Sequence, residues 1–225
     1  MNGLSSKVKY FAVAALVAAF LAAFAFGGRL PDALASGHSH KGGKVTAAEL
    51  AFQNAMRKLW EDHITWTRLY IVSAVGDLAD ANDTAGRLLQ NQTDIGDAIK
   101  PYYGEEAGEQ LEALLTDHIL IAADLITAAK SGDTEAFDAV LASWYANADE
   151  IAAFLSAANP EAWPVEEMQA MMREHLDLTL AEASARLTGD WAADIAAYDQ
   201  IHEQILGMAD MLSTGIISQF PKQFK

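Results

Sequence analysis

Apolar residues recur three and four positions apart along most of the chain, which is the period of an amphipathic α-helix. Alanine, leucine and glutamate dominate these stretches, and runs of β-branched residues are scarce. The pattern predicts an all-α fold, a six-helix bundle without strands. The expected helices span residues 46–80, 84–99, 105–130, 134–157, 165–187 and 191–218.

The breaks between these segments contain residues that begin or end helices. An aspartate is available as N-cap in each of "ADANDTAG", "KSGDTEA" and "LTGDWAA". The prolines in "KPYYGEE" and "ANPEAWPVEE" are expected to end the helices that precede them.

The N-terminal segment has a different pattern from the rest. Two lysines precede an unbroken apolar run over residues 11–26, and "ALAS" follows at the small-residue spacing that a signal peptidase prefers. We expect residues 1–35 to be a signal peptide or membrane anchor, residues 36–45 a flexible His/Gly tether, and residues 46–225 the helical domain. That domain would be extracytoplasmic, in the periplasm or on the outer face of the inner membrane, and would meet the membrane only through the N-terminal segment.

Composition narrows the chemistry that the domain can perform. The formal net charge is −16, which disfavours a nucleic-acid partner because the phosphate backbone is also negative. The chain has no cysteine, so disulfides, thiolate metal sites and thiol catalysis are ruled out. Any metal ion must therefore be bound by histidine nitrogen and by carboxylate, amide or water oxygen.

Three histidines fall in register when "EDHITWTRLYI", "TDHILIAADLI" and "REHLDLTLAEA" are aligned without a gap. They are His63, His118 and His175. Apolar residues four before and three after each histidine place it on the apolar face of its helix. The residue before each histidine is an acid: Asp62, Asp117 and Glu174.

The second helix of each unit also aligns, with Asn91, Asn147 and His202 at the equivalent position. We therefore predict three helical-hairpin repeats of about 55 residues, which either close around a pseudo-threefold axis or stack as a solenoid. The third unit departs from the other two. Acids replace apolar residues at Glu182, Asp199 and Asp210.

A single histidine on an apolar face is usually a core residue bonded to a backbone carbonyl. Three acid–histidine pairs are harder to explain in this way, because each buried polar group without a partner costs roughly 1–3 kcal/mol. We therefore predict a central metal site holding one to three ions. The predicted ligands are His63, His118, His175, His202, Asp62, Asp117, Glu174, Glu182 and Asp199, with Asp210 as a further candidate, while Asn91 and Asn147 would orient ligands or bound water.

Imidazole and carboxylate ligands suit Cu or Zn, and also Fe or Mn. The Glu-x-x-His pair of di-iron bundles is not present, and the nearest match, Asp199-x-x-His202, occurs once. The expected function is therefore the binding of transition-metal ions outside the cytoplasm. Two alternatives stay open, a metal-dependent hydrolase or oxidase and a metal-free sensory or scaffold bundle.

The segments "WEDHITWTR", "RLLQNQTDIGDAIKPYYG", "HLDLT" and "IISQFPKQF" resemble an uncharacterised family of exported or membrane-anchored bacterial helical proteins, over residues 58–225. The resemblance implies a location and a fold more than a mechanism. Some members of such families carry a glycosyltransferase label. This sequence does not support that label, because it has neither an Asp-x-Asp motif nor alternating strands and helices.

Overall fold

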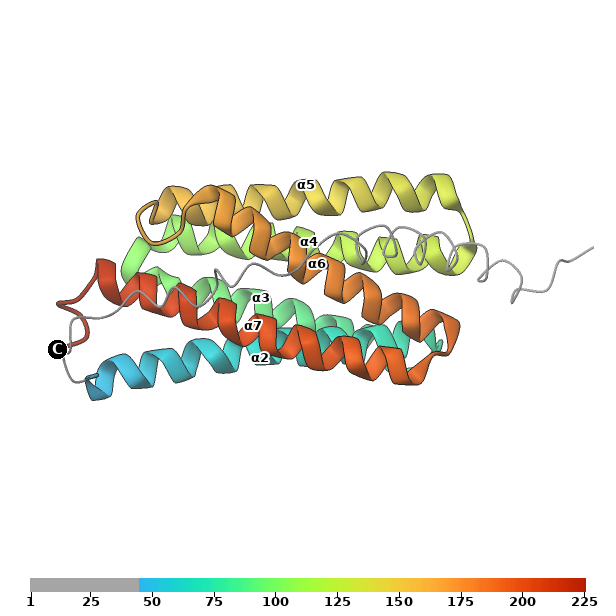
Figure 1. Ribbon diagram of the computed structural model, residues 1–225, viewed down its shortest axis with the longest axis horizontal. Coiled ribbons are helices and arrows are strands. Elements are labelled where there is room, and N and C mark those ends of the chain that lie inside the picture. The colour runs from blue at the N-terminus through green and yellow to red at the C-terminus, as the bar shows by residue number, and fades with distance from the viewer. Residues whose placement is uncertain (1–44) are drawn as a thin grey trace, which may run out of the picture.

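The computed structural model describes residues 45–225, so the predicted signal or anchor segment and most of the tether lie outside the described residues. The described part is all-helical, as predicted, with six helices and no strand (Figure 1). The helices are α2 (Ala47–Val75), α3 (Ala81–Tyr103), α4 (Glu105–Ser131), α5 (Thr134–Ala158), α6 (Val165–Thr188) and α7 (Trp191–Gln219). No helix among the described residues is long and apolar enough to cross a membrane.

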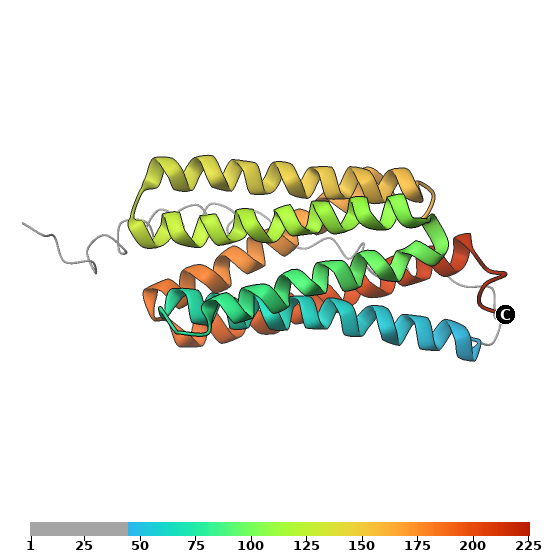
Figure 2. The ribbon, with the colours of Figure 1, turned by 180° about the vertical axis from the view of Figure 1, so that it is seen from behind.

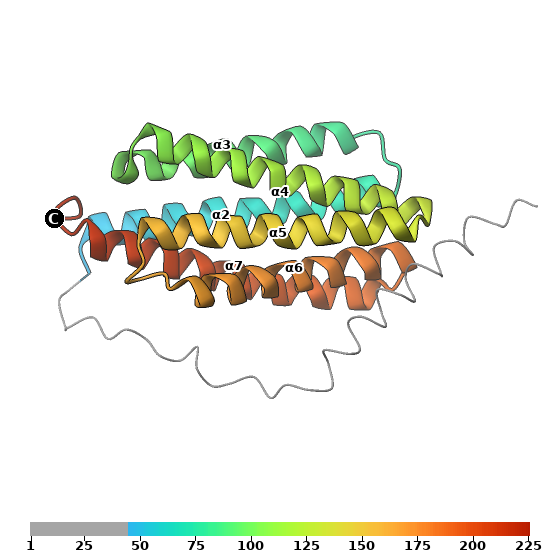
Figure 3. The ribbon, with the colours of Figure 1, turned by 90° about the horizontal axis from the view of Figure 1, so that it is seen from above.

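Consecutive helices run in opposite directions and are joined by short turns (Figures 1 and 2). Each helix packs against the helix before it and the helix after it, and α7 returns to pack against α2. The six helices therefore close into a ring around a common core. Figure 3 shows the same helices from above, lying along one another. As a result α2, α4 and α6 run in the same direction, and α2 also contacts α4 and α6.

Three of the six helix starts, those of α2, α5 and α7, are capped by the side chain of a local polar residue. Thr46 forms a capping box with Glu49, in which each side chain accepts a hydrogen bond from the other residue's backbone N–H. Asp133 and Asp190 cap α5 and α7 by accepting from a backbone N–H three residues later, as predicted. The helix α3 begins at Ala81, three residues earlier than expected, and its N-cap residue Asp80 makes no side-chain cap bond.

The prediction that a proline ends the helix in "KPYYGEE" was wrong for α3. Pro101 lies inside the last turn of that helix, which continues to Tyr103. Gly104 ends it, because its φ of 91° is a conformation that glycine adopts without strain. Proline has no backbone N–H, so the last turn of α3 lacks one helical hydrogen bond, yet the helix continues for two more residues.

Two glycines let α3 and α4 approach closely. A Cβ atom on Gly96 would lie 2.7 Å from the carbonyl oxygen of Gly108, and a Cβ on Gly108 would lie 2.8 Å from that of Gly96. Such distances are too short for any side chain. This crossing therefore requires glycine on both helices.

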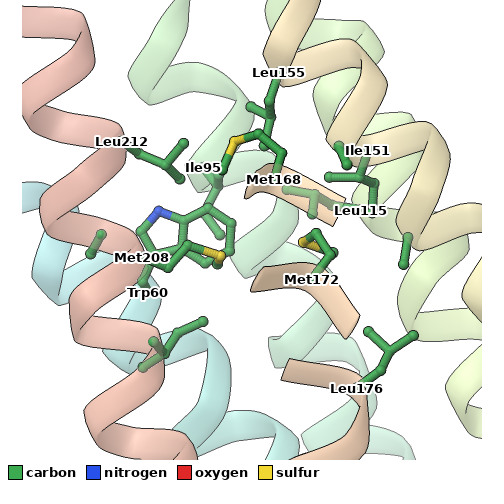
Figure 4. Close-up of a cluster of buried hydrophobic side chains, with 14 of the residues drawn as sticks. Trp60, Ile95, Leu115, Ile151, Leu155, Met168, Met172, Leu176, Met208 and Leu212 are labelled. Atoms are coloured by element: carbon green, nitrogen blue, oxygen red, sulfur yellow. The ribbon is translucent and has the colours of Figure 1, made fainter. Parts of the chain in front are cut away.

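The core contains large apolar side chains from all parts of the ring. Trp60, Leu115 and Met172 each lie three residues before one of the aligned histidines, and each is at most 4% exposed. Figure 4 shows Met172 and Met168 of α6 extending into the space between the surrounding helices. The core next to the histidines, one turn toward the N-terminal ends of α2, α4 and α6, is thus filled by apolar side chains.

The two ends of the described chain meet at one end of the bundle. The Thr46 hydroxyl donates a hydrogen bond to the carbonyl oxygen of Phe224 at 2.7 Å. The Phe224 ring lies 5.2 Å from Phe52 and stacks on Tyr102 with a centroid distance of 5.4 Å. These contacts attach the C-terminal turn to α2 and α3.

Candidate metal centre

The three aligned histidines meet inside the bundle. His63, His118 and His175 lie on α2, α4 and α6, and they are 3%, 3% and 5% exposed. The ring centroid of His175 lies 5.8 Å from that of His63 and 6.3 Å from that of His118. We call these three rings the imidazole layer.

An amide side chain on the second helix of each hairpin holds a backbone carbonyl next to the imidazole layer. In each case the amide NH₂ donates to the carbonyl oxygen of the residue four positions before the histidine. The pairs are Asn91 to Leu59 at 3.0 Å, Asn147 to Leu114 at 3.1 Å, and Gln204 to Met171 at 3.1 Å. The same hydrogen bond between the two helices of a hairpin therefore occurs in all three hairpins.

The orientation of these amides determines the tautomer of two imidazoles. Asn147 Oδ1 lies 2.8 Å from Nδ1 of His118, and Gln204 Oε1 lies 3.3 Å from Nδ1 of His175. Because each amide NH₂ donates to a carbonyl, its oxygen faces the ring and accepts a hydrogen bond from Nδ1–H. Nε2 of both rings then carries the lone pair, as a metal ligand requires.

The first hairpin differs from the other two in this respect. Nδ1 of His63 is buried and makes no well-formed hydrogen bond among the described residues, although the amides of Asn91 and Gln92 lie close enough to influence its pKa. The neighbouring Gln92 is fully buried, donates to the Leu88 carbonyl at 2.7 Å, and leaves its own Oε1 without a partner. A buried ring nitrogen and a buried amide oxygen are thus both unsatisfied at the imidazole layer, at a cost of about 1–3 kcal/mol each.

All three imidazoles are uncharged at neutral pH. Burial lowers the pKa of His118 to about 4, and burial together with repulsion from His118 lowers the pKa of His175 to about 3. Burial also holds the pKa of His63 well below its ordinary value, and the two neighbouring histidines add to this effect. Unprotonated nitrogens are therefore present without any cost of deprotonation.

The acids that precede the histidines do not join the imidazole layer. Asp62 forms ion pairs with Lys58 and Arg87, and Asp117 and Glu174 are exposed to solvent. A residue next to an inward-facing one is rotated by about 100° around the helix. In these helices the rotation carries the carboxylate to the flank, where water and surface cations solvate it.

Glu182 is buried, but it belongs to a separate ionic cluster. Its carboxylate lies 2.7 Å from Arg68, which also lies 2.8 Å from Asp194. Arg186 approaches the same Asp194 carboxylate at 3.3 Å, and the Arg68 guanidinium stacks over Tyr198 at 4.7 Å. We call Arg68, Glu182, Asp194 and Arg186 the ionic cluster; it connects α2 to α6 and α7. Sequence reasoning did not single out Asp194, because an acid in the first turn of a helix is ordinary.

The remaining predicted ligands also lie apart from the imidazole layer. His202 is partly exposed and pairs with Glu61 at 3.0 Å. Asp199 is exposed, and Asp210 forms an ion pair with Arg57 on the surface. Gln204 occupies the place that the alignment assigned to His202. Gln204 lies 29 residues after His175, just as Asn147 lies 29 residues after His118. The correct alignment of α7 with α5 is therefore shifted by two residues from the one that the sequence suggested.

The described residues contain no ready-made metal site of three or more histidine or acidic side chains. A metal–nitrogen bond of about 2.0–2.1 Å places the centroids of imidazoles on one ion roughly 5–5.5 Å apart. The two measured separations, 5.8 Å and 6.3 Å, are longer than this. Binding of all three rings to one ion would therefore require them to move closer together.

An apolar cavity lies one helical turn beyond the imidazole layer, on the side away from the methionines. Its wall includes Thr67 and Thr179, each four residues after a histidine of the layer, and Trp144. Trp144 also stacks on His118 with a centroid distance of 5.3 Å. The imidazole layer is therefore bordered by apolar core on one side and by an apolar cavity on the other.

Comparisons with known proteins give no relative for this chain. No family model, no curated protein and no solved structure matches it.

Proposed function

We propose that the imidazole layer binds a single transition-metal ion through Nε2 of His63, His118 and His175. The observation that carries the proposal is the pair of amide oxygens that accept from Nδ1 of His118 and His175. An acceptor on Nδ1 is the usual partner of a metal-ligating histidine, because it fixes the ring and leaves Nε2 free to coordinate. The ligand set is narrower than the sequence suggested, since it leaves out the acids and His202.

The unsatisfied groups of the first hairpin support the same proposal. A metal ion on Nε2 of His63 makes its Nδ1–H more acidic and hence a stronger donor. A ring drawn toward the ion can also reorient toward Asn91 or Gln92, the two amides that face it. Metal binding would in this way satisfy the orphaned Nδ1 of His63 and the orphaned Oε1 of Gln92.

The charge of the surroundings favours Cu(I) over Zn(II). Three neutral imidazoles leave the full charge of the ion uncompensated, and the solvation cost of burying a charge grows with its square. A zinc ion would offset its charge with a bound hydroxide, but the neighbouring cavity is apolar. Cu(I) carries only one positive charge and can be bound by three nitrogen ligands alone, so it needs no bound hydroxide.

The recurring carbonyl bonds support a threefold internal repeat. If each hairpin is one unit, each supplies one imidazole and one amide, and the three ligands arrive from α2, α4 and α6 related by a pseudo-threefold axis. We further propose that the protein meets its metal outside the cytoplasm, on the basis of the apolar N-terminal segment.

Elemental analysis of the full chain, purified without a histidine tag and under reducing conditions, tests the proposal. We expect about one equivalent of copper per chain after reconstitution with Cu(I). The triple variant H63A/H118A/H175A should lose it, while His202→Ala, a surface histidine variant, should retain it. Metal that persists in the triple variant would refute the site, and zinc in place of copper would refute the assignment of the ion.

A metal-free scaffold is the second candidate. It is favoured by the ring separations, which exceed those on a single ion, and by the amide partner that two of the rings already have. In that case no copper, zinc, iron or manganese would bind after reconstitution. The triple variant would then change only the stability of the bundle.

A further inference from the structure

The larger cavity of the bundle is lined by the same three helices that carry the imidazole layer. It lies between the C-terminal halves of α2, α4 and α6, and α3 and α5 complete its wall. Ile71, Ile119, Ile126, Phe137 and Leu180 are among the side chains that line it. Apolar groups from five helices therefore converge on one space.

The few hydroxyl groups on the wall do not make this space polar. The Thr67 hydroxyl donates to the carbonyl oxygen of His63 at 2.8 Å, and the Thr179 hydroxyl donates to that of His175 at 2.8 Å. The indole nitrogen of Trp144 is buried and has no hydrogen-bond partner among the described residues. A water molecule in a cavity needs about two to four polar partners, and the two threonine hydroxyls are already engaged. The wall is predominantly apolar, although it also includes Tyr70 and Ser184.

The size of the cavity limits what it can hold. It offers about 50 Å³ to the centre of a water-sized sphere, against about 20 Å³ in a second cavity below the imidazole layer, between Trp60, Ile95 and Ile216. Since one such sphere needs roughly 10–15 Å³ by this measure, the larger cavity has room for about three to five water-sized bodies. The smaller cavity has room for one or two at most.

We propose that the larger cavity binds a small neutral apolar molecule of up to about five heavy atoms, a class that includes dioxygen and short hydrocarbons. The ligand gains dispersion contacts with the predominantly apolar walls. Because Trp144 borders both the cavity and His118, the bound molecule stands beside the imidazole layer. The proposal does not depend on whether a metal occupies that layer.

Xenon is a suitable probe, because it is neutral, apolar and small. The full chain, stripped of metal with a chelator and labelled at the isoleucine δ1 methyl groups, is followed by NMR under increasing xenon pressure. We expect saturable shifts for Ile71, Ile119 and Ile126, at least threefold larger than those of Ile95, Ile99 and Ile216, which line the smaller cavity. Equal shifts in both sets, or none in the first, would overturn the proposal.

A filled-cavity variant provides the matched control. Ala129→Leu extends a side chain into the larger cavity and should abolish the xenon shifts of Ile71 and Ile126, whereas Ala158→Leu fills the smaller cavity and should leave them unchanged. Saturable shifts that persist in Ala129→Leu would refute the site. If that variant does not fold, the contrast between the two isoleucine sets in the natural chain still decides the question.

Discussion

At the scale of single residues, the imidazole layer is kept neutral by burial, and this makes stability depend on pH. His118 and His175 have pKa values of about 4 and about 3 in the folded protein, against an ordinary value of 6.5. A base whose pKa is lowered by folding contributes stability that is present above its unfolded pKa and is lost as the pH falls toward its folded pKa. Glu182 acts in the opposite sense. Burial raises its pKa to about 7, although the attraction of Arg68 partly offsets this rise.

We therefore expect the free energy of unfolding to fall as the pH drops from about 6.5 toward 4, by a few kcal/mol each for His118 and His175, with His63 acting in the same direction. The three imidazoles outweigh Glu182, which on its own would add stability as the pH falls from 7 toward 4.5. Urea denaturation at several pH values measures the slope. Glu182→Gln, which removes the opposing group, should make the loss steeper, and a flat profile in the natural chain would show that the imidazoles are not held neutral.

The amide of Asn147 is the residue whose loss should affect His118 most directly. Asn147→Ala removes both the acceptor for Nδ1 and the donor to the Leu114 carbonyl, so we expect a destabilisation of about 1–3 kcal/mol. If the layer binds metal, its affinity should also fall by about 10–100-fold. Chemical denaturation and copper competition titrations measure the two effects. Ser143→Ala, an exposed change on the same helix, should alter neither.

The residues that could be predicted from sequence are those whose side chains point along the apolar stripe. The three histidines share that stripe with leucine and methionine, and the structure brings them together. The adjacent acids could not be placed in the same way, because a carboxylate at the flank of a stripe can turn either inward or toward water. Gln204 was missed because an amide among polar neighbours on α7 gives no signal until the register between the second helices is known.

At the scale of helices, periodicity was sufficient to place all six, and most ends agree within one or two residues. The larger differences are local. The helix α2 ends at Val75, before Gly76 and an Asp77 with a φ of 52°, and α3 runs past Pro101. A helix end depends on the competition between one turn of hydrogen bonds and the packing of a few side chains, which hydrophobic spacing does not reveal.

The crossing of α3 and α4 gives a prediction that separates packing from helix propensity. Gly96→Ala places a methyl group against the Gly108 carbonyl, so we expect a loss of stability of about 1–3 kcal/mol despite the better propensity of alanine. Gly86 lies in the same helix with open space around its Cβ position, and Gly86→Ala should stabilise by about 0.5–1 kcal/mol. Thermal unfolding measures both. A stabilised Gly96→Ala protein would show that the helices lie farther apart.

At the scale of the whole molecule, the ionic cluster closes the ring between α2 and the hairpin of α6 and α7. Glu182 and Asp194 are each 1% exposed, and Arg68 reaches both of them from α2. Two carboxylates in the core require this cation, because an unpaired buried charge costs far more than a hydrogen bond.

Arg68→Met should therefore destabilise the protein by about 3–5 kcal/mol, since it leaves both carboxylates without their main partner. Arg57→Met, at an ion pair that is about half exposed, should cost no more than about 1 kcal/mol. Chemical denaturation at pH 8, where Glu182 is ionised, measures the contrast. Similar losses in the two variants would mean that the cluster is solvated rather than buried.

The hydrogen bond between Thr46 and Phe224 implies that the order of the helices along the chain is not essential to the fold. Because the first and last described turns touch, a short linker can join residue 225 to residue 45, and the chain can be opened instead at Gly132, between α4 and α5. Such a circular permutant keeps every contact around the ring, so it should unfold in one cooperative transition within a few degrees of the original chain. It should also retain the imidazole layer, now assembled from helices in a new sequence order.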